Sequence, residues 1–236
     1  ISERVRGSER REAVEPAHMT RLPLALLAAL ACGCARDRDL ENRVRHYETV
    51  DGLTTTEACH VLFDLAKNVA DGESIVEVGV FKGRSLLALA EGAVAVEGQP
   101  VVVGVDPWNL PRPSKPKYAS DETYQAALDN VAASPAGWLV VLSRSFGVDA
   151  AERFDTQNYG EIGLWYLDAD HRRLPVLADF AAWAPHFAPG AVVCFDDHDL
   201  RTFPGVVEAV AILVKTGRIT EPVMMTDRLA VSRFVQ

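Results

Sequence analysis

Acidic side chains and a histidine follow directly on two apolar segments of the sequence. Asp168 and His171 come after "IGLWYL", and Asp196 and Asp197 come after "GAVVCF". If the fold brings these carboxylates together, they repel one another unless they are protonated or neutralised by a cation. Oxygen ligands of this kind suit a hard ion, with Mg²⁺ first and Mn²⁺ or Ca²⁺ as alternatives. The chemistry therefore depends on the elements that hold the two segments.

Short apolar segments rich in β-branched residues alternate with segments of helical periodicity from residue 51 onward. This alternation is typical of a doubly wound α/β domain, in which a mostly parallel sheet carries helices on both faces. Seven strands are predicted, at residues 74–80, 100–106, 138–143, 162–168, 190–197, 221–226 and 229–235. Helices are predicted at residues 54–70, 83–93, 121–133, 147–154, 174–187 and 205–217. The predicted domain spans residues 51–236 and follows an N-terminal extension over residues 1–50.

The two acidic segments end neighbouring strands in this arrangement. One crossover helix links the strand at 162–168 to the strand at 190–197, so the two strands are expected to lie about 4.8 Å apart. Their carboxyl ends then bring Asp168, Asp196 and Asp197 into one candidate metal site. The alternative is that aspartates only punctuate the strand ends. We prefer that interpretation for Asp170 and Asp199.

A second group of residues lies beyond the carboxyl ends of the first strands, where open α/β sheets bind their ligands. Glu77, Gly79 and Gly83 are spaced as E-x-G-x-x-x-G, which lets the backbone turn tightly at the start of the next helix. Asp106 ends the second strand, where an acidic side chain can accept the ribose hydroxyls of a nucleoside. Phe81 stands where a dinucleotide fingerprint requires glycine, which weakens a nicotinamide cofactor. Taken singly, Asp106 could also be a strand-ending residue and Glu77 a partner of a helix dipole.

The segment "VEVGVFKGRS" resembles the first motif of catechol O-methyltransferase and its relatives, which are class I S-adenosylmethionine-dependent methyltransferases. The acidic residue, the two glycines, the aromatic residue and the serine stand in the same order. The resemblance implies the Rossmann-like methyltransferase fold with S-adenosylmethionine as the cofactor. It also implies that Asp106 holds the ribose and that Ser145 lies near the adenine. The residues expected around the methionine part of the cofactor are Glu77, Gly79, Phe81, Gly83 and Ser85.

The acidic strand ends resemble those of metal-dependent O-methyltransferases of the catechol and macrocin types. Both types carry an acid at the end of the fourth strand and an acidic or amide pair at the end of the fifth. The macrocin type also has a histidine three residues after the first acid, as Asp168 and His171 are spaced here, whereas catechol enzymes have lysine at that place. The likeness runs from about Leu53 to Phe234. It implies methyl transfer to a sugar hydroxyl of a natural product, with a phenol or catechol hydroxyl as the second possibility.

Methyl transfer to a hydroxyl requires removal of a proton, and His171 is the candidate general base. Its unperturbed pKa near 6.5 leaves the imidazole able to accept a proton at neutral pH. The alternative is that His171 is a solvated residue in the loop after the strand. Two other function classes remain open from the sequence alone, a nicotinamide-dependent oxidoreductase and a non-catalytic protein that binds the cofactor without turnover.

Composition and the first 50 residues restrict the partners and the location. The net charge is −9 and no cluster of Lys or Arg is present, which argues against a nucleic-acid partner. The apolar segment from Leu22 to Cys34 is too short to span a bilayer, and it is expected to be a packed helix or, alternatively, a secretory signal. We expect no membrane partner, a cytoplasmic enzyme that acts on a small molecule, and possible homo-oligomers. The four cysteines show neither zinc-site spacing nor the density of a disulfide scaffold, which fits a reducing compartment: Cys32, Cys34, Cys59 and Cys194.

Overall fold

A computed structural model describes residues 45–110 and 120–236, which belong to one compact unit. The predictions made for the first 44 residues, including the apolar segment from Leu22 to Cys34, lie outside the described residues. The same holds for most of the proline-rich loop that follows the second strand. Among the helices of the described part, none combines the length and the apolar character that are needed to cross a membrane.

Seven strands form one sheet in the order β3-β2-β1-β4-β5-β7-β6. The pairs formed by β1 with β2, β2 with β3, β1 with β4 and β4 with β5 are parallel, whereas β7 runs antiparallel to β5 and to β6. The predicted doubly wound, mostly parallel seven-stranded sheet is therefore confirmed. The strands are β1 (Ser74–Val78), β2 (Val102–Asp106), β3 (Val140–Arg144), β4 (Ile162–Leu167), β5 (Phe187–Phe195), β6 (Val223–Met224) and β7 (Ala230–Arg233).

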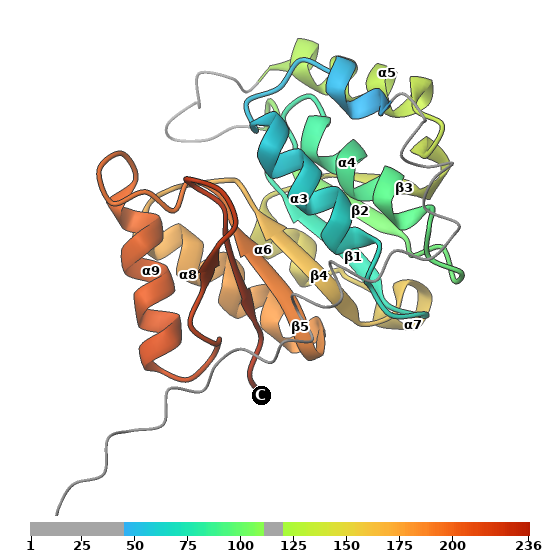
Figure 1. The fold of residues 1–236 in the computed structure, drawn as a ribbon. Helices are drawn as coiled ribbons and strands as arrows, with labels where there is room; N and C mark the ends of the chain where they lie inside the picture. Colours follow the sequence, from blue (N-terminus) through green and yellow to red (C-terminus); the bar gives the residue numbers. More distant parts are fainter. Residues whose placement is uncertain (1–44, 111–119) are drawn as a thin grey trace, which may run out of the picture. The chain divides into compact units, whose positions relative to one another are not determined.

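Helices cover both faces of the sheet (Figure 1). One face packs against α3 (Thr56–Ala66), α4 (Arg84–Ala93) and α5 (Asp121–Ala133). The other packs against α6, α8 and α9. These three helices span Gly147–Ala151, Arg173–Trp183 and Pro204–Lys215.

The central strand β4 is buried along its whole length, which explains its continuous apolar sequence. Successive side chains of a strand point to opposite faces. Trp165 accordingly packs among Phe180, Phe187 and Phe195, while Tyr166 belongs to the core beneath α3 and α4. Burial on both sides fixes the register of β4 and so the place where its acidic end emerges.

The described part also contains short helices, most of which the hydrophobic periodicity of the sequence did not predict. They are η1 (His46–Thr49), η2 (Gly137–Leu139), α7 (Thr156–Tyr159) and η3 (Ala184–His186). The first lies before the predicted domain start at residue 51, yet Tyr47 is fully buried. The backbone N–H groups of His46 and Tyr47 donate to the carboxylate of Glu91 in α4, at 3.1 and 3.2 Å. Residues 46 and 47 are thus part of the packed domain.

Candidate active site

The reversal of the strand order places the candidate site at the carboxyl ends of β1 and β4. These two strands lie side by side, and from them the chain winds outward in opposite directions. Ligands of open α/β sheets bind at such a switch point. Glu77, Asp106 and Asp168 all lie at or near this edge of the sheet.

The loop after β1 turns through backbone conformations that favour glycine. Gly79 and Gly83 have φ angles of +100° and +92°, and Phe81 between them has a φ of +52°. A Cβ atom on Gly79 would lie only 2.0 Å from the backbone oxygen of Asp168, whereas one on Gly83 would meet nothing within 4 Å. Glycine at position 79 therefore lets the loop after β1 pass directly beside the acidic end of β4.

The carboxyl group of Glu77 is buried, and only one of its two oxygens accepts a hydrogen bond from the described residues. Its Oε1 accepts a hydrogen bond from the Ser85 hydroxyl at 2.5 Å. Its Oε2 is buried and has no hydrogen-bond partner among the described residues. Burial raises the pKa of Glu77 well above its ordinary value, opposed by the bond from Ser85. A buried acceptor without a donor is costly, so this atom is a candidate contact for a ligand that carries N–H or O–H groups.

Asp106 holds the loop together. Its Oδ2 accepts from the backbone N–H groups of Val80 and Phe81, both at 3.0 Å, and its Oδ1 accepts from the backbone N–H of Trp108 at 2.6 Å. The indole N–H of Trp108 donates in turn to the backbone oxygen of Phe81 at 2.8 Å. Asp106 thus has an organising role in the folded chain that the sequence did not predict.

Ser145 follows β3 and lies next to Asp106. Its backbone N–H donates to the backbone oxygen of Asp106 at 3.1 Å. Its hydroxyl accepts from the guanidinium of Arg153 at 2.6 Å and is buried. The ends of the first three strands therefore gather the residues expected at the cofactor, although the Ser145 hydroxyl is already engaged by a protein partner.

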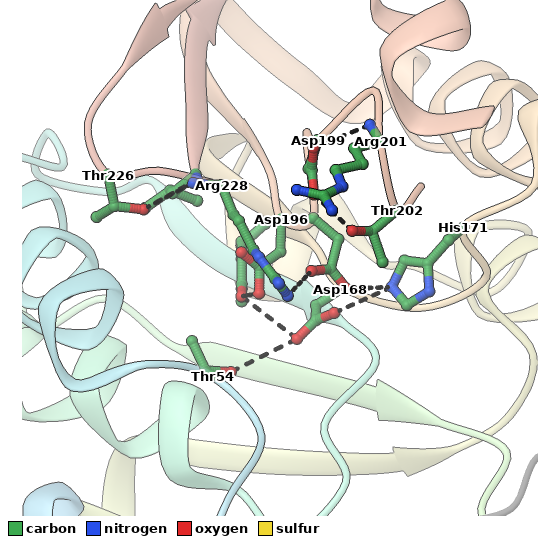
Figure 2. A network of polar contacts seen from close by, with 12 residues as sticks. Thr54, Asp168, His171, Asp196, Asp199, Arg201, Thr202, Thr226 and Arg228 are labelled. Carbon is green, nitrogen blue, oxygen red and sulfur yellow. Dashed lines mark hydrogen bonds and ion pairs between the residues drawn. The ribbon is translucent and has the colours of Figure 1, made fainter. Parts of the chain in front are cut away.

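Asp168, His171 and Asp197 form the centre of the acidic cluster. Figure 2 shows His171 beside Asp168. The Nε2 atom of His171 lies 3.5 Å from Oδ1 of Asp168 and 3.2 Å from Oδ2 of Asp197. Each of the three offers a ligand atom, and these atoms lie within 4.8 Å of one another, close enough to hold one metal ion. The ring of Phe203 packs against the imidazole of His171 in a tilted arrangement, at a ring-centroid distance of 4.5 Å.

Electrostatics in the cluster reflect crowding of like charges. Two opposing effects act on the pKa of His171. Burial, the largest single effect, lowers it, whereas the hydrogen bond to Asp168 and the charges of Asp168, Asp197 and Asp196 raise it. The net result is a raised pKa for His171. Burial raises the pKa of Asp197, opposed by the charges of His171 and Arg228. The guanidinium of Arg228, from the turn between β6 and β7, lies 3.2 Å from Asp197 Oδ1. A cation from the protein therefore already offsets part of the negative charge.

Asp196 has a different environment from the other predicted metal residues. The phenol of Tyr166 donates to its Oδ2 at 3.0 Å, and it lies outside the group of three with metal-ligand spacing. Burial, followed by the charges of Asp168 and Asp197, raises the pKa of Asp196. The cluster thus contains three residues around a possible ion site, two aspartates and a histidine, and a third aspartate that accepts from a phenol.

Asp170 and Asp199 stabilise turns, as predicted. The carboxylate of Asp170 pairs with the Arg172 guanidinium at 2.6 Å. That of Asp199 accepts from the backbone N–H of Arg201 and from the hydroxyl of Thr202. The sequence missed Tyr166, Thr54 and Arg228, since Tyr166 stands in an apolar strand and the other two in loops without a pattern.

Fold and site together define the class of the protein. The strand order, the glycine-containing loop after β1 and the acidic end of β2 are those of class I S-adenosylmethionine-dependent methyltransferases. A family profile described as "Methyltransferase domain" matches residues 76–198, just over half of the 236 residues, and the chain belongs to that family. The predicted recognition as a class I methyltransferase is confirmed, and the nicotinamide-dependent alternative is set aside.

Solved structures share the fold at low sequence identity. The calicheamicin methyltransferase CalS11 is 19% identical, with all of both chains covered and a TM-score of 0.58. TomG from Streptomyces achromogenes, an O-methyltransferase involved in tomaymycin synthesis, is 16% identical over 88% of this chain and 90% of its own, with a TM-score of 0.60. An O-methyltransferase from Bacillus cereus is 16% identical over 92% and 94%, with a TM-score of 0.56. A search of curated proteins finds no match.

Proposed function

We propose that this methyltransferase moves the methyl group of S-adenosylmethionine to a hydroxyl of a small molecule beside a bound divalent cation. The observation that carries the proposal is the contact between two groups of residues. The loop that follows β1 and its unsatisfied Glu77 passes against the backbone of Asp168 at Gly79. Asp168 in turn belongs to the cluster with metal-ligand spacing. A cofactor on the loop and a cation in the cluster would be neighbours.

The buried acceptor at Glu77 fits the cofactor. The amino group of the methionine part carries N–H donors, which Oε2 of Glu77 lacks among the described residues. Ser85 holds the other carboxylate oxygen and so fixes the direction of Oε2. Gly79, Phe81 and Gly83 shape the loop around the same part of the cofactor, and Asp106 and Ser145 are proposed at the ribose and the adenine.

The donor set of the cluster fits a divalent cation, Mg²⁺ first and Mn²⁺ or Ca²⁺ next. Asp168 and Asp197 would supply oxygen ligands, and His171 points its Nε2 at both of them. Asp196, also proposed for this site from the sequence, would stand behind these ligands. When bound, the cofactor supplies an electrophilic methyl group and the cation lowers the pKa of a hydroxyl that it contacts.

His171 has two possible roles in this site, and the geometry favours one of them. Nε2 of His171 faces two carboxylates, so this nitrogen is well placed to bind the same cation as they do. If Nε2 binds the cation, it cannot also accept a proton as a general base. The base role predicted from the sequence is the second candidate, and it is supported by the same two acids, which would stabilise the imidazolium formed on proton transfer. Metal titration of a His171→Ala variant separates the two. A ligand role predicts weaker metal binding, and a base role predicts unchanged metal binding with a loss on the order of 10² to 10⁴ in kcat.

We propose a sugar hydroxyl of a natural product as the acceptor, and a phenol or catechol hydroxyl second. The spacing of Asp168 and His171 supports the first, as does the likeness of fold to CalS11, described as a TDP-rhamnose 3'-O-methyltransferase of calicheamicin biosynthesis. A cytoplasmic location, where S-adenosylmethionine is made, and possible homo-oligomers complete the proposal. Recovery of a processed protein in an exported fraction would contradict this location.

The proposal is tested by incubating the purified protein with methyl-labelled S-adenosylmethionine, Mg²⁺ and a panel of glycosides and phenols, with products identified by mass spectrometry. We expect methylation of a hydroxyl that stops on addition of EDTA and returns with Mg²⁺. Asp168→Asn should raise the metal concentration that is required, whereas the matched variant Asp170→Asn, at the same strand end but paired with Arg172, should not. Full activity in excess EDTA would rule out the metal.

A further inference from the structure

We propose that the hydroxyl groups of Tyr166 and Thr54 position the carboxylates of the metal site, so that Asp168 turns one oxygen toward the ion and Asp196 stays behind it. This inference rests on the metal site proposed above. It assigns two residues that neither the sequence pattern nor the family match singles out, and Thr54 lies outside the matched residues 76–198.

Tyr166 connects the two strand ends from within the core. Its side chain is fully buried on the face of β4 that packs under α3 and α4. Its hydroxyl lies 3.0 Å from Asp196 Oδ2 and 3.4 Å from Asp168 Oδ2. The phenol carries one proton, and the shorter distance assigns it mainly to Asp196. A phenylalanine would pack equally well here, so the hydroxyl itself requires an explanation.

Thr54 approaches Asp168 from the segment that precedes α3. Its hydroxyl lies 3.5 Å from the same oxygen of Asp168, Oδ2, and its side chain is buried (Figure 2). The guanidinium of Arg84 fixes this segment by donating to the backbone oxygen of Thr54 at 3.1 Å and to the hydroxyl of Thr56 at 2.7 Å. Thr54 is therefore held in place by the first residue of α4.

The two oxygens of the Asp168 carboxylate have different surroundings. Oδ2 faces Tyr166 and Thr54, while Oδ1 faces His171 at 3.5 Å. Groups that hydrogen-bond metal ligands orient them, and losing such a group typically costs about 10- to 100-fold in metal affinity. Thr54 is thus a positioning residue that would act through Asp168, and Tyr166 one that would act mainly through Asp196.

The test measures binding of Mn²⁺ alone to the cofactor-free protein by calorimetry. Tyr166→Phe and Thr54→Val remove one hydroxyl each and should each weaken Mn²⁺ binding about 10- to 100-fold. Thr54→Ser keeps the hydroxyl and should bind as the wild type does. Tyr159→Phe makes the same chemical change in α7, before β4 begins, and should also bind normally. Circular dichroism of each variant reports folding separately.

The outcomes separate this inference from the proposed function. A wild-type protein that binds no Mn²⁺ overturns the metal site itself. A wild-type protein that binds Mn²⁺, with Tyr166→Phe and Thr54→Val binding as tightly, overturns only the positioning role. If Tyr166→Phe does not fold, the threonine pair decides, because equal Mn²⁺ affinities of Thr54→Val and Thr54→Ser would overturn the inference.

Discussion

Asp106 shows how one side chain can serve both the folded chain and its ligand. Its two oxygens accept three backbone N–H groups from the segments after β1 and β2. A residue predicted only as a ribose ligand therefore also holds the loop that shapes the cofactor site. Substitutions at this position should affect stability even when no cofactor is present.

We expect Asp106→Asn to lower the free energy of unfolding by about 1–3 kcal/mol in the absence of cofactor, because an amide nitrogen cannot accept the N–H bonds that it would face. Thermal unfolding of the cofactor-free variant measures the loss, and calorimetry with S-adenosylhomocysteine measures affinity. Asp129→Asn, on the exposed face of α5, is the control. A variant with unchanged stability would contradict the organising role.

Substitutions at Gly79 and Gly83 can separate two effects of an added Cβ atom. One is backbone strain at a positive φ, and the other is a clash with the backbone of Asp168. Both have left-handed backbone conformations, so alanine at either costs about 1–2 kcal/mol. Only at position 79 would the added Cβ also meet the backbone of Asp168. We expect Gly79→Ala to destabilise the protein clearly more than Gly83→Ala, as measured by urea unfolding. Equal losses would contradict the contact between the loop and β4.

Residues that end strands were predictable, and residues that support them were not. Asp168 and Asp197 stand out because charge follows directly on buried segments, and Glu77 and Asp106 stand out by their spacing from glycines and prolines. Tyr166 gives no such signal, because an aromatic residue in an apolar strand indicates core packing whether or not its hydroxyl is used. Only the register of β4 against β5 brings its hydroxyl to Asp196.

At the scale of elements, side chains from just before α4, from its first residue and from near its end fix the segment that precedes α3. Lys82 and Arg84 bind it near Asp51 and Thr54, and Glu91 binds the backbone of η1. The segment that carries Thr54 is thus fixed at both ends. The sequence predicted the long helices and the strands through their periodicity, but η1 and α7 are single turns, too short to show any.

Glu91 should make stability depend on pH. Burial raises its pKa to about 7, opposed by the N–H groups of Tyr47 and His46 and by the hydroxyl of Ser134. The folded state therefore binds the proton more tightly than the unfolded chain, so the contribution of Glu91 is most favourable at low pH and is lost as pH rises to about 7. Between pH 5 and 8, the wild type should lose about 2–3 kcal/mol relative to Glu91→Gln.

Urea unfolding at several pH values from 5 to 8 measures this difference, in which the pH effects common to both proteins cancel. Glu152→Gln, at an exposed position next to α6, should follow the wild type across the range. A constant difference between wild type and Glu91→Gln would show that Glu91 does not titrate there. We expect the free energy of unfolding of Glu91→Gln to increase relative to that of the wild type as pH rises.

At the scale of the whole molecule, membership in the methyltransferase family predicts which ligand stabilises the fold. A ligand present at about 100 times its Kd adds about 2.7 kcal/mol to the free energy of unfolding. We therefore expect S-adenosylhomocysteine to raise the Tm by about 5–10 °C at that concentration, given about 2–4 °C per kcal/mol for a domain of this size. NADH, tested in the same thermal-shift assay, should leave the Tm unchanged. The reverse result would contradict cofactor binding at the loop after β1.

The central position of β1 and β4 has a consequence for the nascent chain. The two strands pair in the middle of the sheet, yet β2 and β3 lie between them in the sequence. Until β4 leaves the ribosome, one edge of the apolar strand β1 has no partner, and an open apolar edge can pair with other chains. Ribosome-bound chains that stop short of Ile162 are therefore the species that most need a chaperone.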